Sequence, residues 1–456
     1  MFKRANVWVW AAIFALGLSG CGTQNTENQA AKEVFDHPEW SYNATIYELN
    51  TRQFTEEGTF AAAEKKLQEL KELGIEIVWV MPIHPIGEKN RKGELGSYYA
   101  IKDYKGVNPE FGDLEDFKSF VNRAHELEMK VIIDWVANHT AWDHPWTETN
   151  PEYYNRDEDG NFQPPVEDWS DVIDLNYENP DVWAAMIDAL EYWVREADID
   201  GYRCDVASMV PTDFWNEARM RLDEIKPVFM LAEAEKPEHH NQAFDMSYAW
   251  SMHHVMNKVA SDEMEVYHID STLRANRARF PEHAFRMQFT SNHDENSWNG
   301  TVFERLGDGA KTFAVLSATM EGMPLIYNGQ EVGMDKRLEF FDKDPIEWKE
   351  SDFRPFYTQL MHLKQDHPAL RNGTRGEPME RISTSDTTSV YAFSRGEAGE
   401  KVVVFLNFSG EQVSFEAEHS TLSGTYERLF GGEEVTLEDM ESLTLEPWEY
   451  RVLVAQ

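Results

Sequence analysis

From residue 44 to residue 365 the chain alternates short apolar runs with longer segments whose apolar residues recur at helical spacing. A run such as 75–81, between Gly74 and Pro82, is typical of a buried parallel strand, because both faces of such a strand are covered. The apolar runs predict strands at 44–49, 75–81, 130–135, 201–204, 228–232, 244–249, 285–290 and 324–327. The periodic segments predict helices at 59–73, 114–127, 181–196, 214–225, 309–320 and 353–365, with further helical stretches between 250 and 280.

Eight strands that alternate with helices predict an α/β protein built as a TIM (β/α)8 barrel over residues 40–372. A long segment after the third strand, 141–177, is rich in Trp, Pro, Asn and Asp and is predicted to be an irregular insertion. After residue 372 the pattern changes to short β-rich runs at 389–394, 401–408, 412–416, 425–429 and 450–454. No helical period interrupts them, so residues 373–456 predict a C-terminal antiparallel β-sandwich domain.

The first 39 residues have a different character and are predicted to be an export signal and a tether. Two basic residues precede an apolar run at 7–18, which is too short to span a bilayer and is typical of a signal peptide, predicted as 1–20. The run ends in Leu18, Ser19, Gly20 and Cys21, which resembles the bacterial lipobox. The resemblance implies lipidation of Cys21 and a polar tether over 21–39; the alternative is an ordinary secretory signal with a chance cysteine.

These residues predict an exported protein, anchored by lipid to a bacterial membrane, in the first place the outer membrane, and facing the periplasm or the cell surface. The anchor is the expected contact with the membrane. Cys204 is the other cysteine of the chain, so a structural disulfide is not expected. Its place in an apolar strand predicts a small buried residue.

Charge narrows the possible partners. The chain has 42 Lys and Arg against 82 Asp and Glu, a formal net charge of −40. Nucleic acid is excluded as an expected partner, because binding to phosphates needs a positive surface. Docking of the folded domain on anionic lipid is disfavoured for the same reason. A neutral substrate is compatible with this surface.

Charged and polar residues follow four of the predicted strands, where catalytic residues of a TIM barrel lie. The candidates are Asp134, Asn138 and His139 after the third strand, Arg203 and Asp205 at the fourth, Glu233 after the fifth, and His293 and Asp294 after the seventh. A single acid at a strand end is weak evidence of a functional site. Charged residues at four strand ends that converge on one face are stronger evidence, because burying so many charges without a function is costly.

These segments resemble the signature regions of the α-amylase family of glycoside hydrolases, in the order of that family. The four regions are 134–139, 201–205, 231–234 and 291–294. Residues 96–104 resemble the family's loop after the second strand, and 322–331 resemble its eighth strand. The resemblance covers the chain from about Trp40 to the C-terminus.

The resemblance implies roles for the three carboxylates. Asp205 would be the nucleophile that forms a covalent glycosyl-enzyme, and Glu233 would be the general acid and then the general base. Asp294 would grip sugar hydroxyls and raise the proton affinity of Glu233. Arg203 lies two residues before Asp205 on the same strand face, so its charge is expected to keep Asp205 ionised.

The resemblance also assigns substrate-binding and supporting residues. His139 and His293 would hydrogen-bond substrate hydroxyls, with Arg203 beside them, and Tyr99 would stack under the sugar at the cleavage point. Asp134 would support the site. No cofactor is required for the chemistry. Asn138 matches a position that often binds structural calcium, so calcium is possible, although Met209 stands where many calcium-binding relatives have His.

Five other residues leave alternatives open. Glu235 is expected either on the acceptor side or as a solvated loop acid, and Trp298 either in the cleft or in packing. His84 is expected at the rim of the site or in loop structure. For the pair His239 and His240, an exposed polar loop is a better interpretation than a metal site.

The predicted function is a retaining hydrolase of the α-1,4-glucosidic bonds of starch, glycogen or maltooligosaccharides. The alternative is an α-glucan transglycosylase, which uses the same carboxylates. A remote alternative is a non-catalytic glucan-binding protein, which should have lost at least one of the three carboxylates. All three are present.

Overall fold

The computed structural model describes residues 35–397 and 399–456. The predicted signal peptide, Cys21 and most of the tether lie outside the described residues. Residues His37–Gln456 form one compact unit, which contains the predicted barrel and the C-terminal domain. In the described part of the chain, no helix has the length and apolar character needed to cross a membrane.

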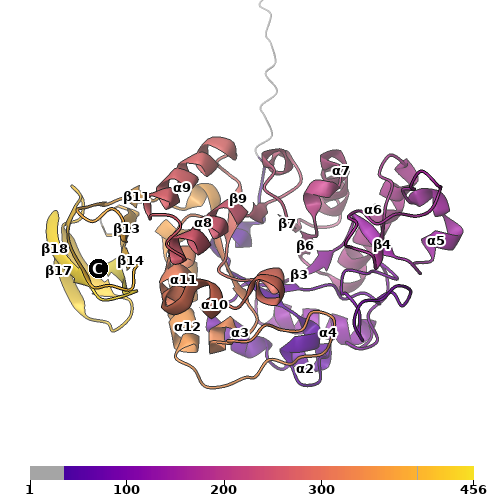
Figure 1. Ribbon diagram of the computed structural model, residues 1–456, viewed down its shortest axis with the longest axis horizontal. Coiled ribbons are helices and arrows are strands. Elements are labelled where there is room, and N and C mark those ends of the chain that lie inside the picture. Colours follow the sequence, from indigo (N-terminus) through magenta and orange to yellow (C-terminus); the bar gives the residue numbers. More distant parts are fainter. Residues whose placement is uncertain (1–34, 398) are drawn as a thin grey trace, which may run out of the picture. The chain divides into compact units, whose positions relative to one another are not determined.

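Eight parallel strands close into a barrel, which confirms the predicted fold (Figure 1). They follow the order β1-β10-β9-β8-β7-β6-β3-β2 around the barrel. Their bounds are Ile46–Leu49 (β1), Ile77–Val80 (β2), Lys130–Trp135 (β3), Gly201–Cys204 (β6), Phe229–Ala232 (β7), Met246–Tyr248 (β8), Phe285–Gln288 (β9) and Met323–Tyr327 (β10). Each lies within or beside a predicted strand, because these apolar runs are buried on both faces.

Helices follow most of the strands. Except at 51–54 and 302–306, where no helix was predicted, their bounds agree with the periodic segments to within a few residues. They are Thr51–Phe54 (α1), Phe60–Glu64 (α2), Leu67–Leu73 (α3), Leu114–Glu126 (α4), Pro180–Ala197 (α6), Thr212–Asp223 (α7), Trp250–Ala260 (α8), Tyr267–Arg279 (α9), Val302–Leu306 (α10), Ala310–Thr319 (α11) and Phe353–Asp366 (α12). The single helix predicted at 59–73 is wrong. Lys66 adopts φ −97° and ψ −4°, which interrupts the helical ladder and leaves α2 and α3 as separate elements.

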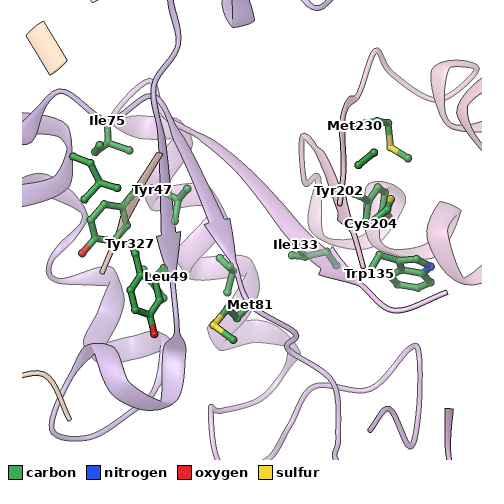
Figure 2. Packing of buried hydrophobic residues seen from close by; sticks show 14 of the residues in the cluster. Tyr47, Leu49, Ile75, Met81, Ile133, Trp135, Tyr202, Cys204, Met230 and Tyr327 are labelled. Carbon is green, nitrogen blue, oxygen red and sulfur yellow. The ribbon is translucent and has the colours of Figure 1, made fainter. Parts of the chain in front are cut away.

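Successive side chains along each barrel strand point alternately to the helices and to the barrel interior, so the barrel has two apolar cores. Tyr47 and Leu49 of β1 face the helices, whereas Ile46 faces the barrel interior. Figure 2 shows the helix-facing set on several strands, including Trp135, Tyr202 and Cys204. Cys204 is fully buried, as predicted. The positions between these residues therefore point inward.

At the carboxyl ends of the strands the inward positions are polar rather than apolar. They carry Glu48 on β1, Asp134 on β3 and Arg203 on β6, all with no exposed surface. Apolar side chains from the lower strand positions fill the barrel beneath them. The fold thus gathers buried charges at one end of a packed barrel, where catalytic residues of such barrels lie.

The insertion after β3 is more ordered than predicted. It contains the helix Trp146–Thr149 (α5) and an antiparallel pair formed by His139–Ala141 (β4) and Val172–Asp174 (β5). These strands are three residues long, too short for a periodic pattern to indicate. Pairing of β4 with β5 fixes the backbone at His139, one of the predicted site residues.

The C-terminal region forms two antiparallel sheets around a shared apolar core, which confirms the predicted sandwich. One sheet has the order β11-β13-β14-β19-β16-β17, and the other β12-β15-β18. Their strands are Glu380–Arg381 (β11), Ser383–Thr384 (β12), Val390–Arg395 (β13), Val402–Asn407 (β14), Val413–Glu418 (β15), Gly424–Arg428 (β16), Glu434–Leu437 (β17), Met440–Leu445 (β18) and Tyr450–Ala455 (β19). The sequence pattern missed β17 and β18, whose side chains are mostly exposed and polar.

Candidate active site

The three predicted catalytic carboxylates lie in one cleft at the carboxyl ends of the barrel strands. Asp205 follows β6, Glu233 follows β7 and Asp294 lies beyond the end of β9. They line a cavity of about 430 Å³. Tyr99, His139 and His293 line the same cavity. Parallel strands bring these distant residues together, because all their carboxyl ends meet at one rim.

Arg203 is the centre of the charge network beneath this cleft. Its Nη1 lies 2.9 Å from Asp134 Oδ1 and 3.0 Å from Asp205 Oδ1, and its Nη2 lies 3.0 Å from Glu233 Oε2. Its Nε donates a hydrogen bond to the hydroxyl of Tyr248, at 3.1 Å. Burial opposes the charge of Arg203, but Asp134 and Glu233 outweigh burial and raise the pKa of the guanidinium. One buried cation therefore serves three carboxylates.

Asp205 and Glu233 form a coupled pair of acids. Burial raises the pKa of both. Repulsion by Glu233 raises the pKa of Asp205 further, and Asp294 does the same for Glu233, while Arg203 lowers both pKa values. The expectation that the charge of Arg203 keeps Asp205 ionised is wrong, because burial and repulsion by Glu233 outweigh Arg203 and raise the pKa of Asp205 well above its ordinary value. The state with both groups ionised is disfavoured, so the pair tends to hold one proton.

His293 is held in its charged form by a second network. Its Nδ1 lies 2.5 Å from Glu48 Oε1, and its Nε2 lies 2.8 Å from the Tyr99 hydroxyl, which in turn donates to Asp134 Oδ2 at 3.1 Å. Burial opposes the charge, but the carboxylates of Asp294 and Glu48 outweigh it and raise the pKa of His293 to about 9. At neutral pH both ring nitrogens of His293 therefore donate.

Glu48 is a residue of this site that sequence reasoning missed. It is fully buried on β1, and burial raises its pKa while the charge of His293 lowers it. A lone glutamate within the apolar run 44–49 was the available signal, since an unpaired buried carboxylate is costly. Its partner His293 lies 245 positions later in the chain.

His139 and Tyr99 lie where they can face a sugar. His139 is 3% exposed, and burial lowers its pKa to about 3, so its imidazole is neutral. Its ring centroid lies 5.6 Å from that of Trp169. The ring of Tyr99 is nearly parallel to that of Phe340, with a centroid distance of 6.2 Å and an angle of 13°. Trp298 also lines the cleft and is 52% exposed.

Val206, directly after Asp205, has an unusual backbone conformation. Its φ is 35° and ψ is 45°, in the left-handed region that β-branched residues rarely adopt. Its N–H donates to Glu233 Oε2 at 2.7 Å. Strain of this kind persists where surrounding structure maintains it, often at functional sites. Here the conformation accompanies a hydrogen bond to the predicted acid.

Two of the open alternatives are decided by side-chain contacts. Glu235 pairs with Arg286 and accepts a hydrogen bond from Ser251 Oγ at 2.9 Å. It is neither a solvated loop acid nor a residue of the described cleft lining. His84 has no exposed surface, so it does not rim the site. It packs edge-on against Trp135, and burial lowers its pKa to about 4.

The prediction of an exposed loop at His239 and His240 is wrong. Both side chains are fully buried. His239 packs edge-on against Phe244, with ring centroids 5.2 Å apart, and His240 Nε2 lies 2.8 Å from Ser247 Oγ. Within residues 35–397 and 399–456 no group of three or more His, Cys, Asp or Glu side chains is arranged to hold a metal ion.

The surroundings of Asn138 do not fit a calcium ion. Its amide oxygen lies 3.2 Å from His139 Nδ1, and its carbonyl accepts from the Leu175 N–H at 3.0 Å. In the insertion, Asp174 binds Asn155 Nδ2 at 2.6 Å, and Asp171 pairs with Lys92 at 3.1 Å. Calcium requires about six to eight oxygen ligands. These oxygens already have protein partners, so the residues present do not form a calcium site.

Comparisons with known proteins bear on the family of the chain. The family described as "Alpha amylase, catalytic domain" matches residues 25–169 and 166–375, and "Maltogenic Amylase, C-terminal domain" matches 379–452. The α-amylase MalA of Haloarcula japonica is 28% identical over 401 residues, which are 84% of this chain and 58% of that protein. The α-1,4-glucan:maltose-1-phosphate maltosyltransferase of Salinibacter ruber is 27% identical over 427 residues, 83% of this chain and 61% of that protein.

Solved structures match along nearly their whole length. The maltogenic α-amylase AmyB from Thermotoga neapolitana has a TM-score of 0.83 and 31% identity, and the match covers 91% of this chain and 99% of that one. An α-amylase from Lactobacillus plantarum has a TM-score of 0.82 and 33% identity, with the same coverage. The catalytic-domain family matches more than half of this chain, and these solved structures match nearly all of it. The chain therefore belongs to the α-amylase family of glycoside hydrolases.

Proposed function

We propose that this enzyme cleaves α-1,4-glucosidic bonds of starch, glycogen or maltooligosaccharides with retention of configuration. The observation that carries the proposal is the placement of Asp205 and Glu233 on the two terminal nitrogens of one guanidinium, in a cleft with Asp294. Retaining chemistry needs two close carboxyl groups, one ionised and one protonated. A coupled pair that tends to hold one proton provides this combination.

The proton of the pair belongs on Glu233 in the resting enzyme. Asp205 Oδ1 accepts a hydrogen bond from Arg203 Nη1, which favours its ionised form. The neighbouring Asp294 carboxylate raises the pKa of Glu233 and favours its protonated form. Arg203 and Asp294 thus favour the proton on Glu233, although burial and repulsion by Glu233 also raise the pKa of Asp205.

The reaction then runs in two displacements. Glu233 donates its proton to the glycosidic oxygen while Asp205 attacks the anomeric carbon, so the bond to the leaving sugar breaks and a covalent ester forms. Glu233, now ionised, removes a proton from a water molecule. The water oxygen attacks the same carbon and releases Asp205 as a carboxylate. No cofactor takes part in either step.

Residues around the pair bind the sugar at the cleavage point. The charged His293 and the carboxylate of Asp294 can hydrogen-bond its hydroxyls, and the neutral His139 can do so from the opposite wall. The ring of Tyr99 offers a flat face for stacking. Asp134 acts indirectly, because it holds Arg203 and the hydroxyl of Tyr99.

A product time course on maltoheptaose and soluble starch tests the proposal. Asp205→Asn and Glu233→Gln should lower the rate of reducing-end formation by at least about a thousandfold, as expected for loss of a catalytic group. Glu235→Gln is the matched control: it lies two residues from Glu233, is paired with Arg286 and should keep most of the activity. Activity retained in Asp205→Asn would refute the proposal.

The same assay distinguishes hydrolysis from transglycosylation, the second candidate. Two findings bear on it: some relatives are named maltosyltransferases, and the carboxylates would be shared. A phosphorylated donor fits this cleft poorly, because four carboxylates line it, and its cations Lys92 and His293 are already paired with carboxylates of the protein. Products longer than maltoheptaose without new reducing ends would favour a transferase. A purely glucan-binding protein would leave both substrates unchanged.

We further propose that the protein is exported and anchored through a lipid on Cys21, on the outer membrane of its bacterium. The support is the lipobox-like pattern at residues 18–21. Labelled palmitate fed to expressing cells should be incorporated into wild type and not into Cys21→Ser, whereas Cys204→Ser should label normally. Equal labelling of wild type and Cys21→Ser would refute the anchor.

A further inference from the structure

Two walls of the cleft are joined by a lysine from the loop after β2. Lys92 Nζ lies 3.1 Å from Asp171 Oδ1 and donates to the carbonyl of Asp168 at 2.7 Å, both in the insertion. We call these contacts the Lys92 bridge. Lys92 and Asp171 both line the cavity that holds the catalytic carboxylates. The bridge therefore connects two walls of the cleft itself.

The same loop is also tied to the long segment after β10. The Leu95 N–H donates to the carbonyl of Phe341 at 3.0 Å, and the Glu94 N–H donates to Asp342 Oδ1 at 2.9 Å. Gly93 has φ +64°, and a Cβ built on it would lie 2.3 Å from the Cβ of Phe341. The two segments are thus in direct backbone contact.

These contacts hold the bridge more firmly than its ion pair alone would. An exposed ion pair contributes little by itself. Here the Asp171 side chain is only 7% exposed, and backbone hydrogen bonds fix the residues that follow Lys92. Three chain segments, from the β2 loop, the insertion and the β10 loop, therefore meet at this end of the cleft.

The position of the bridge relative to the reacting groups decides which end is closed. In the proposed mechanism the leaving sugar lies beyond Glu233, which protonates it. The sugar that becomes bound to Asp205 lies over Tyr99. Lys92 belongs to the same loop as Tyr99, and Phe340, which stacks on Tyr99, is adjacent to Phe341 at the junction. These contacts place the bridge on the side of the sugar that Asp205 takes.

We propose that the Lys92 bridge closes this end of the cleft, so that the enzyme attacks glucans from their non-reducing ends and releases short oligosaccharides. An enzyme that cuts within a polymer needs a cleft open at both ends, because the chain continues past the site in both directions. A cleft closed on one side admits only a chain terminus. The inference rests on the proposed hydrolase activity and adds its direction and product size.

Two nitrophenyl maltoheptaosides test the proposal, one free and one capped at its non-reducing end with a benzylidene group. Wild type should cleave the free substrate at least about tenfold faster than the capped one, which corresponds to about 1.4 kcal/mol of transition-state binding. Chromatography of early products should show short oligosaccharides from the free substrate. On amylose, iodine staining should fall slowly relative to the rise in reducing ends.

Lys92→Ala and Asp171→Asn should each open the closed end and raise the rate on the capped substrate relative to the free one. Lys89→Ala is the matched control. Lys89 lies on the same loop, with its Nζ 5.5 Å from the ring centroid of Trp142. Its removal should leave the ratio of the two cleavage rates unchanged. Equal cleavage of both substrates by wild type would overturn the proposal, as would an unchanged ratio in both opening variants. Cleavage of neither substrate by wild type would instead overturn the proposed hydrolase activity.

Discussion

At the scale of single residues, two cationic side chains of the site each contact several other groups. Arg203 contacts Asp134, Asp205 and Glu233, and His293 lies between Glu48 and the hydroxyl of Tyr99. Removing one partner therefore changes the protonation of groups that it does not touch. This coupling makes pH dependence an informative measurement for the site.

Glu48→Gln should move the alkaline limits of both stability and activity to lower pH. His293 has a pKa near 9 in the folded protein against an ordinary value of 6.5. A pKa raised by folding contributes stability that is complete below about pH 6.5 and is lost as pH rises through 9. Gln removes one of the carboxylates that raise this pKa. The loss should then begin at lower pH, with about 1–2 kcal/mol less stability at pH 6–7.

Melting temperature and kcat/KM measured from pH 5 to pH 10 check this prediction. Glu331→Gln is the control, since Glu331 is equally buried and bonds to Tyr47 rather than to His293. It should cost stability without displacing the alkaline limit of kcat/KM. An unchanged alkaline limit in Glu48→Gln would show that Glu48 does not set the charge of His293.

At the scale of elements, helix α4 begins with a reciprocal cap. Asp113 accepts hydrogen bonds from the N–H groups of Glu115 and Asp116, and the Asp116 side chain accepts from the N–H of Asp113. This cap fixes the start of α4 at Leu114, the residue at which the periodic pattern also begins. The helical period of the sequence predicted this boundary, and the local cap coincides with it.

Asp113→Ala should destabilise the protein by about 1 kcal/mol, because N–H groups of the first turn lose their acceptor. The melting temperature should fall by about 2 °C, with kcat/KM unchanged, since α4 contributes no residue to the described cleft lining. Glu115→Ala, two residues further along the chain, removes a surface pair with Lys118 and is the control. Equal melting temperatures for the two variants would contradict a capping role for Asp113.

At the scale of the whole molecule, the C-terminal sandwich is packed on the barrel rather than appended to it. The rings of Phe313 on α11 and Phe408 after β14 have centroids 4.6 Å apart. Arg395 of β13 is 2% exposed and donates to the carbonyls of Thr319 and Met320 at the end of α11, at 3.2 and 2.8 Å. We therefore expect the two domains to unfold together.

Arg395→Met should lower stability by about 3 kcal/mol or more, because it leaves buried carbonyls without donors. Wild type should melt in one calorimetric transition, and the variant should melt earlier or in two steps. Arg451→Met is the control, since Arg451 lies on the same sheet and pairs with Glu449 in a partly exposed position. If Arg395→Met melted like Arg451→Met, the junction would contribute little.

Removal of divalent cations should leave the protein intact. The oxygens near Asn138 already have protein partners, so no ion is needed to satisfy them. We expect the melting temperature and the activity in excess EDTA to match those in added calcium. A melting temperature several degrees lower in EDTA would show that a calcium ion is bound and that the partners of Asn138 rearrange around it.

The sequence by itself determined the barrel, the sandwich and the residues at the strand ends. These features depend on periods of two and 3.6 residues and on the rule that parallel strands end at one rim. It did not indicate the break at Lys66, the pairing of β4 with β5 or the burial of His239 and His240, since tertiary packing decides each of them. Nor did it indicate the contact of Glu48 with His293 or the Lys92 bridge, whose partners lie 245 and 76 positions apart. Such contacts depend on how loops close over the barrel, and no local pattern encodes that closure.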